Sequence, residues 1–387
     1  MIVSRIKLKN WRNFRSVDVD LQRRQFLIGP NASGKSNFLD VFRFLRDIAS
    51  TEGGGLQKSL KDRGGVSKIR SLAARRDPEV AIEVHLADKP GNPHKWRYGI
   101  GIEQETRGYR RRALLTYERV WRGNEKILDR PDEEDRKDPV RLTQTFLEQI
   151  NANRAFRDIA DLFQSIAYLH LVPQLLRFAD SIQGRVLESD PFGQGFLERI
   201  AGTPDKTRRP RLERIEKALK TVVPQIEQLQ FIRDAATGRP HLQALYAHWR
   251  PKAGWQREDQ FSDGTLRLIG ILWVLQEGNS PLLLEEPELS LNSGIVSQLA
   301  PLISRMQRAP RRQVLISTHS DALLTEPGID GREVLILDPS REGTEVRPAS
   351  AIDDVKALLE AGFTVGEAAL PKTRHSDMDR FAATISP

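Results

Sequence analysis

The stretch GPNASGKS, residues 29–36, constrains the fold more than any other part of this chain. It matches the pattern G-x-x-x-x-G-K-[ST] of a phosphate-binding loop. The short, mainly apolar run at residues 25–28 before it is typical of a buried strand. After it, Phe38, Leu39, Phe42, Leu45 and Ile48 recur at the three- and four-residue steps of a helix. This motif binds phosphate when it forms a loop between a strand and a helix N-terminus. The sequence therefore predicts an α/β core that binds a nucleotide.

Each part of this loop has an expected task. Gly29 and Gly34 permit tight backbone turns, and the N–H groups that follow converge on phosphate oxygens at the positive end of the helix. Lys35 is expected to reach the β- and γ-phosphates, and Ser36 to ligate Mg²⁺. The predicted nucleotide-binding residues here are Gly29, Pro30, Asn31, Ala32, Ser33, Gly34, Lys35, Ser36 and Asn37. The simpler alternative, a Gly-rich turn with a lone lysine, does not explain the strand before it and the helix after it.

A second apolar run ends in two carboxylates, in the stretch PLLLEEPELSL at residues 281–291. Open α/β sheets bind ligands at the carboxyl ends of their strands. Successive strand residues point to opposite faces, so the two carboxylates can have different tasks. We expect Glu285 to join the Mg²⁺ shell and Glu286 to orient or deprotonate the attacking water. The alternative is a strand that ends in a solvated charged turn.

Two further segments carry candidate site residues. In QVLISTHS, residues 313–320, a strand leads to His319, whose neutral imidazole could hydrogen-bond the γ-phosphate and the attacking water. A lone histidine after a strand is otherwise an ordinary surface residue. In FSDGTLRL, Ser262 or Asp263 is a good N-cap for a helix, and Gly264 leaves the N-terminal amides uncovered. The simpler interpretation of that segment is a capped helix and nothing more.

The segments GPNASGKSN, FSDGTLRL, LLLEEPELSLN and LISTHSDALL, in this order, resemble the ATP-binding-cassette (ABC) ATPases of the SMC and RecF type. They resemble more closely the prokaryotic AAA-21 and OLD-like branch. The resemblance covers residues 1–139 and 259–350. It implies two chains that enclose two ATP molecules, each ATP lying on one phosphate loop and contacting the signature serine of the other chain. On this resemblance Ser262, Asp263 and Gly264 contact ATP held by a partner chain, and residues 288–292 line the interface.

Further assignments rest on the same resemblance. Gln174, in LVPQLLR, is similar to a glutamine that senses Mg²⁺, and Asn13, Phe14 and Arg15 are similar to residues that border the nucleotide. The chain also departs from the pattern. Its signature reads SDGTL, Glu285 replaces the usual aspartate of the acidic pair, and no long coiled coil is visible. OLD nucleases carry a TOPRIM nuclease domain after this part, and the short helical tail expected here leaves no room for one.

The expected fold is an α/β, ABC-type P-loop NTPase head, with a mixed sheet core, antiparallel strands and an inserted helical arm. The predicted domains are residues 1–139, an N-terminal lobe with the phosphate loop; 140–258, the arm with short strands; and 259–387, a C-terminal lobe with the signature, the acidic pair, His319 and a helical tail. A charged linker is expected over residues 129–140. A charged helix is expected to open at Pro210 and to close before Pro224. The arm is either a solvated projection or a surface that grips a partner.

Composition limits the partners and the compartment. The formal charge of +8 permits an anionic partner such as nucleic acid without requiring one. Basic clusters at residues 107–112, 206–211 and 307–312 are either ordinary surface or able to follow phosphates. The absence of cysteine excludes disulfides, iron–sulfur clusters and thiolate zinc sites. No signal peptide or membrane-length apolar run is visible, so we expect a cytoplasmic protein.

These features together predict an ATPase that uses ATP and Mg²⁺ and acts as a switch. The chain is expected to dimerise around two ATP molecules, and a higher oligomer is the alternative. The resemblance favours prokaryotic anti-phage defence with a separate effector protein, a nuclease or a toxin. One alternative is a RecF- or SMC-type DNA-binding ATPase in DNA repair. Another is a nucleotide-dependent assembly scaffold that does not hydrolyse ATP. The signature and the inserted arm both fit the ATPase subunit of a transporter poorly.

Overall fold

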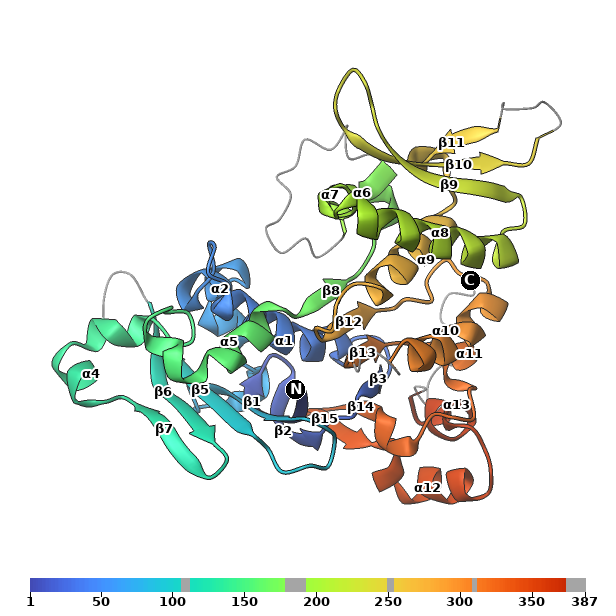
Figure 1. Cartoon of the computed structure of the whole chain (residues 1–387). Coiled ribbons are helices and arrows are strands. Elements are labelled where there is room, and N and C mark those ends of the chain that lie inside the picture. Colours follow the sequence, from blue (N-terminus) through green and yellow to red (C-terminus); the bar gives the residue numbers. More distant parts are fainter. Residues whose placement is uncertain (106–111, 178–192, 249–253, 308–311, 374–387) are drawn as a thin grey trace, which may run out of the picture. The chain divides into compact units, whose positions relative to one another are not determined.

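The computed structural model describes residues 1–105, 112–177, 193–248, 254–307 and 312–373 (Figure 1). These residues form two compact units. The first unit comprises Met1–Ala167, Ser280–Leu283 and Arg311–Pro387, and the second comprises Tyr168–Asn279 and Leu284–Pro310. The boundaries of the two units differ from those of the three expected domains. Residues 140–167 were expected in the arm, but they belong to the first unit. Residues 374–387 of the tail and most of the basic clusters at 107–112 and 307–312 lie outside the described residues.

The first unit contains an antiparallel sheet with the strand order β2-β1-β4-β5-β6-β7. Its strands are β1 (Ile2–Trp11), β2 (Phe14–Asp20), β4 (Val80–Ala87), β5 (Trp96–Gln104), β6 (Ala113–Arg122) and β7 (Glu125–Arg130). Apolar and polar residues alternate along β1 and β2, so each strand has one buried face. Turns at residues 89–93 and 123–124 join β4 to β5 and β6 to β7 as antiparallel hairpins.

A second six-stranded sheet has the order β15-β14-β3-β13-β12-β8. Its strands are β3 (Arg24–Ile28), β8 (Ala167–Leu169), β12 (Leu282–Glu285), β13 (Val314–Ser317), β14 (Val334–Ser340) and β15 (Gly343–Pro348). The central strand β3 is buried along its whole length and pairs in parallel with both β13 and β14. The chain passes between the two units inside β8 and again inside β12. An α/β core of mixed sheets is therefore confirmed.

The first unit also contains α-helices. Helix α1 (Lys35–Ala49) follows the phosphate loop and buries the expected apolar face, including Phe38, Phe42 and Leu45. The other helices are α2 (Leu56–Asp62), α3 (Val66–Ile69), α4 (Glu133–Lys137), α5 (Arg157–Gln164), α11 (Asp321–Leu324), α12 (Asp353–Glu360) and α13 (Val365–Ala369). Short 3₁₀ turns, among them η2 (Pro139–Thr143) and η3 (Ala152–Phe156), lie in the stretch between α4 and α5.

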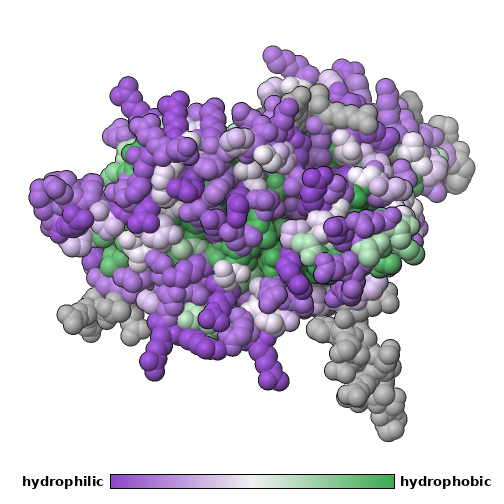
Figure 2. Space-filling model, turned by 90° about the horizontal axis from the view of Figure 1, so that it is seen from below, coloured by the Kyte–Doolittle hydropathy of each residue, from purple (hydrophilic) through white to green (hydrophobic). Residues whose placement is uncertain are grey.

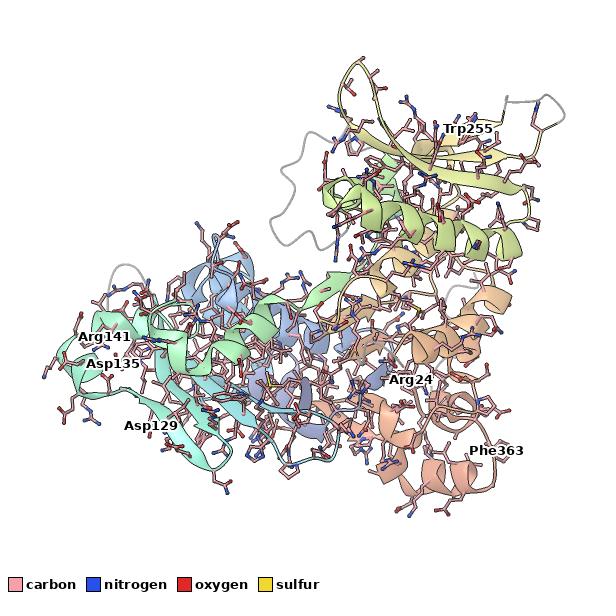
Figure 3. The ribbon with its side chains drawn as sticks, in the orientation of Figure 1. Arg24, Asp129, Asp135, Arg141, Trp255 and Phe363 are labelled. Carbon is pink, nitrogen blue, oxygen red and sulfur yellow. The ribbon has the colours of Figure 1, made fainter. Side chains whose placement is uncertain are left out.

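The charged linker expected at residues 129–140 is wrong in its central part. Arg130 and Asp135 there are fully buried, and Arg130 donates hydrogen bonds at 2.9 Å to both carboxylate oxygens of Asp135. Arg130 also bonds Glu118 at 3.0 Å and the backbone carbonyls of Gln144 and Arg141. Asp135 and Arg141 lie beside each other in Figure 3, with 3.5 Å between their charged groups. Arg130 and Asp135 therefore hold the end of the sheet together, while Glu133, Glu134 and the charged residues 136–138 face solvent.

The second unit combines helices with a small sheet (Figure 1). Its helices are α6 (Pro173–Arg177), α7 (Phe196–Gly202), α8 (Asp205–Val222), α9 (Asp263–Leu275) and α10 (Ser293–Met306). Strands β9 (Ile226–Arg233), β10 (Pro240–Tyr246) and β11 (Trp255–Arg257) form an antiparallel sheet in the order β11-β10-β9. Helix α9 is buried at every position from Thr265 to Leu275.

The expected start of α8 at Pro210 is wrong, although its end before Pro224 is confirmed. The helix begins at Asp205 and contains Pro210. A proline near the start of a helix removes only one backbone hydrogen bond. Burial of Leu212, Ile215 and Leu219 farther along α8 offsets that loss.

The face of the molecule drawn in Figure 2 is mainly hydrophilic. The face in Figure 2 is largely purple, and a smaller group of green, apolar residues lies near its middle. Among the described residues, no helix combines the length and the apolar character needed to cross a membrane.

Candidate nucleotide-binding site

The phosphate loop joins β3 to α1 in the first unit. Gly34 has a left-handed backbone with φ of 99°, and Ala32 also has a positive φ of 63°. The Nζ atom of Lys35 donates to the backbone carbonyls of Gly29 and Pro30 at 3.0 and 3.1 Å. Its ammonium group therefore lies within the curve of the loop. Lys35 is itself buried, whereas Asn31, Ala32 and Ser36 around it are exposed. The loop therefore surrounds a cation with residues that a phosphate group can reach.

Gly29 gives the loop its close packing on the sheet. A Cβ atom at this position would lie 2.5 Å from the carbonyl oxygen of Leu337 in β14 and 2.6 Å from the Oγ of Ser33. Neither neighbour is the end of a flexible side chain, because one is backbone and Ser33 is itself buried. Only glycine fits there, and β14 thus supports the loop from behind.

Asn13 braces the loop through its side chain. Its Nδ2 donates to the carbonyl of Ser33 at 2.7 Å and to the hydroxyl of Thr344 at 2.8 Å, and its Oδ1 accepts from the amide of Asn37 at 3.0 Å. A Cβ atom on Gly34 would lie 2.1 Å from that Nδ2. The structure therefore places Asn13 against the loop backbone.

The two residues after Asn13 lie elsewhere. Phe14 is fully buried and packs edge-on against Phe38 of α1, with 6.1 Å between the ring centroids. Its side chain belongs to the core, and its expected position at the border of the nucleotide stays a prediction. Arg15 is exposed and pairs with Glu342 at 2.8 Å.

A group of charges that no sequence motif indicates anchors α1 directly behind the loop. Asp40 of α1 pairs with Arg12 at 2.7 Å and with Arg63 at 2.9 Å. Burial alone would raise the pKa of Asp40, but the positive charges of Arg63 and Arg12 outweigh it and lower the pKa. Trp11 donates from Nε1 to the carbonyl of Asn37 at 2.9 Å. Proximity in sequence to Asn13 is the only signal that could have pointed to Trp11 and Arg12.

His319 follows β13 just as the phosphate loop follows β3. The two strands are parallel, with Ser317 opposite Leu27, and the N–H of Thr318 donates to the carbonyl of Leu27 at 3.1 Å. The carboxyl ends of neighbouring parallel strands meet at the same edge of a sheet. The exposed His319 therefore lies at the edge of the first unit that carries the phosphate loop.

The two carboxylates at the end of β12 belong to the second unit. Glu285, the last residue of the strand, accepts a hydrogen bond from the hydroxyl of Tyr168 at 2.5 Å. Glu286 has a left-handed backbone with φ of 44°, a conformation that costs a non-glycine residue about 1–3 kcal/mol. Because of this turn, its side chain does not continue the strand alternation. Tyr168 was not singled out in the sequence, where it is one apolar residue of a short strand.

The signature segment begins α9, also in the second unit. The Oγ of Ser262 accepts from the N–H of Thr265 at 3.1 Å, so Ser262, and not Asp263, is the N-cap. A Cβ atom at Gly264 would lie 2.5 Å from the carbonyl oxygen of Ser290. The loop at residues 286–291 therefore packs directly on the first turn of α9, and Ser262 remains exposed.

Gln174 lies against this same turn. Its Nε2 donates to Oδ2 of Asp263 at 2.7 Å, and Arg177 pairs with Oδ1 of Asp263 at 2.6 Å. The described contact of Gln174 is thus with the signature, and its expected role at Mg²⁺ stays a prediction. Within α9, burial lowers the pKa of Arg267, while the carboxylates of Asp263, Glu288 and Glu286 act in the opposite direction.

The two units thus supply different chemical groups. The first has a cationic loop and an imidazole, and the second has paired carboxylates and an exposed helix N-terminus. Among the described residues, no group of three or more His, Cys, Asp or Glu side chains could hold a metal ion. Mg²⁺ in nucleotide sites is usually held by one or two protein ligands together with substrate phosphates. Ser36 and Glu285 have the oxygen chemistry for that task.

This fold and these motifs define an ABC-type ATPase head of the SMC and RecF class. The family described as "AAA domain, putative AbiEii toxin, Type IV TA system" (AAA_21) matches residues 26–325. The chain belongs to this family, which confirms the resemblance seen in the four motifs.

Among relatives, the DNA replication and repair protein RecF of Agathobacter rectalis is 29% identical over 87 residues, covering 22% of this chain and 24% of RecF. Endonuclease GajA of Bacillus cereus (strain VD045) is 45% identical over 47 residues, covering 12% of this chain and 8% of GajA. The chain thus spans about a quarter or less of the length of these relatives. An SMC head solved in complex with the C-winged helix domain of ScpA is similar in fold, with a TM-score of 0.51 and 14% identity over 90% of this chain and 98% of that one.

Proposed function

We propose that this chain binds ATP with Mg²⁺ on residues 29–37 and hydrolyses it. The observation that carries this proposal is the ammonium of Lys35, held within the curve of a glycine-shaped loop between β3 and α1. That group is placed to meet the negative charge of a polyphosphate. Membership of an ATPase family and the similarity to RecF support the same function.

Each residue of the proposed site has its own role in ATP hydrolysis. Lys35 and the loop N–H groups hold the β- and γ-phosphates, and Ser36 and Glu285 hold Mg²⁺, which neutralises phosphate charge when bound. Tyr168 orients Glu285 through their hydrogen bond. Glu286 positions the attacking water and accepts its proton. His319, exposed at the edge that carries the loop, contacts the γ-phosphate.

A second copy of the chain completes each site in this proposal. The exposed N-terminus of α9, with Ser262 and Gly264, is an anion-binding terminus separate from that of α1. We assign it to ATP held by the other chain, so that binding joins two chains and hydrolysis releases them. Gln174 and residues 288–292 then lie beside the shared nucleotides.

For the biological role, we propose a switch in anti-phage defence that acts on a separate effector, a nuclease or a toxin. The similarity to endonuclease GajA and the toxin named in the family description support this role. A DNA-binding ATPase in repair is the second candidate, which the match to RecF favours. The exposed basic residues Lys206 and Arg209 of α8 are available to phosphates in either case.

The central test compares ATP binding and turnover in the wild type and Lys35→Ala. Loss of a charge-assisted contact to phosphate should weaken ATP binding by about 10- to 100-fold and remove turnover. Lys58→Ala, at an exposed lysine paired with Asp62 on α2, is the matched control and should behave as the wild type. Unchanged ATP affinity in Lys35→Ala would contradict the assigned loop. Turnover with and without double-stranded DNA at two salt concentrations separates the roles, since only the repair ATPase should respond to DNA.

A further inference from the structure

Arg177 holds the residues on both sides of Ser262. Its Nη1 pairs with Oδ1 of Asp263 at 2.6 Å, and its Nη2 donates a short hydrogen bond to the backbone carbonyl of Phe261. Phe261 is buried, so this carbonyl belongs to a fixed part of the backbone. One guanidinium group therefore fixes the chain immediately before and immediately after the signature serine.

Other contacts complete the enclosure of this turn. Gln174 occupies Oδ2 of Asp263, so both carboxylate oxygens accept hydrogen bonds or an ion pair from α6. On another side, Gly264 packs against the carbonyl of Ser290. The exposed hydroxyl of Ser262 thus lies in a turn whose neighbours on either side are held.

Asp263 creates an electrostatic problem that Arg177 solves. A carboxylate at the first position of a helix is attracted to the N-terminal amides, which are the groups that an incoming phosphate must reach. Its negative charge would also repel that phosphate. The ion pair with Arg177 turns the carboxylate toward α6 and neutralises its charge.

We propose that Arg177 is a positioning residue for the signature, which keeps Ser262 and the first amides of α9 ready for the phosphate of an ATP bound to a second copy of the chain. The inference rests on the proposed function, in which the signature acts on the other chain's nucleotide. It adds Arg177, the last residue of the segment LVPQLLR, in which only Gln174 was expected to have a role. The ion pair is partly exposed, at 21% for Arg177 and 29% for Asp263. A pair of this kind contributes little to stability, so its effect should appear in turnover.

The first test substitutes Arg177→Gln and measures ATP affinity, turnover and thermal unfolding. ATP affinity should stay within about twofold, because the phosphate loop is unchanged, while turnover should fall by roughly 10- to 100-fold, as expected for a displaced positioning group. The matched control is Arg257→Gln, which removes an ion pair with Asp234 at 3.1 Å in the same unit and should leave turnover unchanged. Wild-type turnover in Arg177→Gln would overturn the proposal.

A second variant separates positioning from a simple loss of packing. Asp263→Asn keeps the size of the side chain and removes its charge. Added to Arg177→Gln, it should recover part of the lost turnover, because the repulsion that Arg177 neutralises is then gone. No recovery, together with a lowered unfolding temperature in Arg177→Gln, would assign Arg177 a structural role and overturn the proposal.

Mixed dimers test whether Arg177 acts on the other chain. Arg177→Gln should be inactive through its signature and Glu286→Gln through its own nucleotide site, so a mixed dimer contains one intact site. A 1:1 mixture should therefore recover about a quarter of wild-type turnover when chains pair at random. The reference mixture replaces Arg177→Gln with Ser262→Arg, which blocks the signature directly.

The mixtures distinguish two kinds of failure. Recovery with Ser262→Arg but not with Arg177→Gln would leave the shared site intact and overturn the role of Arg177. Recovery in neither mixture would overturn the shared site itself, and the inference with it. Lys35→Ala mixed with Glu286→Gln should stay inactive, because both substitutions damage the site of their own chain.

Discussion

Gly34 shows how strongly a single residue determines the phosphate loop. It combines a left-handed backbone with contact against the amide of Asn13, which is held by three hydrogen bonds. A side chain at this position therefore meets two obstacles, one in the backbone and one in the neighbouring side chain. The shape of the loop depends on both glycine and asparagine.

Gly34→Ala should accordingly lower the free energy of unfolding by about 1–3 kcal/mol and weaken ATP binding. Denaturant unfolding and ATP titration measure the two effects. Gly91→Ala is the matched control, because Gly91 also has a positive φ, of 76°, but no atom lies within 4 Å of an added Cβ. It should cost about 1–2 kcal/mol and leave ATP affinity unchanged. An unaffected ATP affinity in Gly34→Ala would show that the loop tolerates the displaced Asn13.

At the scale of the element, the end of the antiparallel sheet is held by a buried network of charges. Burial raises the pKa of Glu118, and the N–H groups of Phe146 and Leu147 and the charge of Arg130 oppose that rise. The guanidinium of Arg130 also stacks on Phe146 at 4.0 Å. The network joins β6, β7, α4 and the loop at residues 144–147.

Arg130→Ala should therefore destabilise the protein by about 3–5 kcal/mol, because it leaves Glu118 and Asp135 buried without their counter-charge. Thermal or denaturant unfolding measures the loss. Arg119→Ala breaks the neighbouring but exposed pair with Asp129 at 2.8 Å and should cost less than about 1 kcal/mol. Equal losses in the two variants would contradict a special role of the buried network.

These elements show what could be predicted from the sequence and what could not. The strand, loop and helix at residues 25–49 follow local patterns of apolar residues and glycine, and the structure contains them. The burial of Arg130 and Asp135 depends on Glu118, which lies 12 residues from Arg130 in another strand, so charge pattern alone indicated a solvated linker. The site shows the same difference between local and long-range features. Its motifs are visible in the sequence, but the contacts of Tyr168 with Glu285 and of Arg177 with Asp263 join residues that are distant in sequence.

At the scale of the whole molecule, the proposed function predicts an assembly that depends on nucleotide. Glu286→Gln should lower turnover by at least about 100-fold, since the proton acceptor is lost, and should keep the chain dimeric in ATP and Mg²⁺. Sedimentation velocity with and without ATP measures the assembly. Glu227→Gln, at an exposed glutamate of β9, is the control and should turn over as the wild type. Normal turnover in Glu286→Gln would remove that residue from the mechanism, and a Glu286→Gln chain that stays monomeric in ATP would contradict the enclosed dimer.

The order of strands around β3 also limits how the chain can be shortened. The family match ends at residue 325, before β14, which pairs with β3 and lies against Gly29. A fragment limited to residues 26–325 would expose the backbone donors and acceptors along one side of β3, and it would lose Asn13 as well. Bare strand edges recruit other strands, so such a fragment is liable to aggregate. The recognisable part of the sequence is smaller than the part that must fold together.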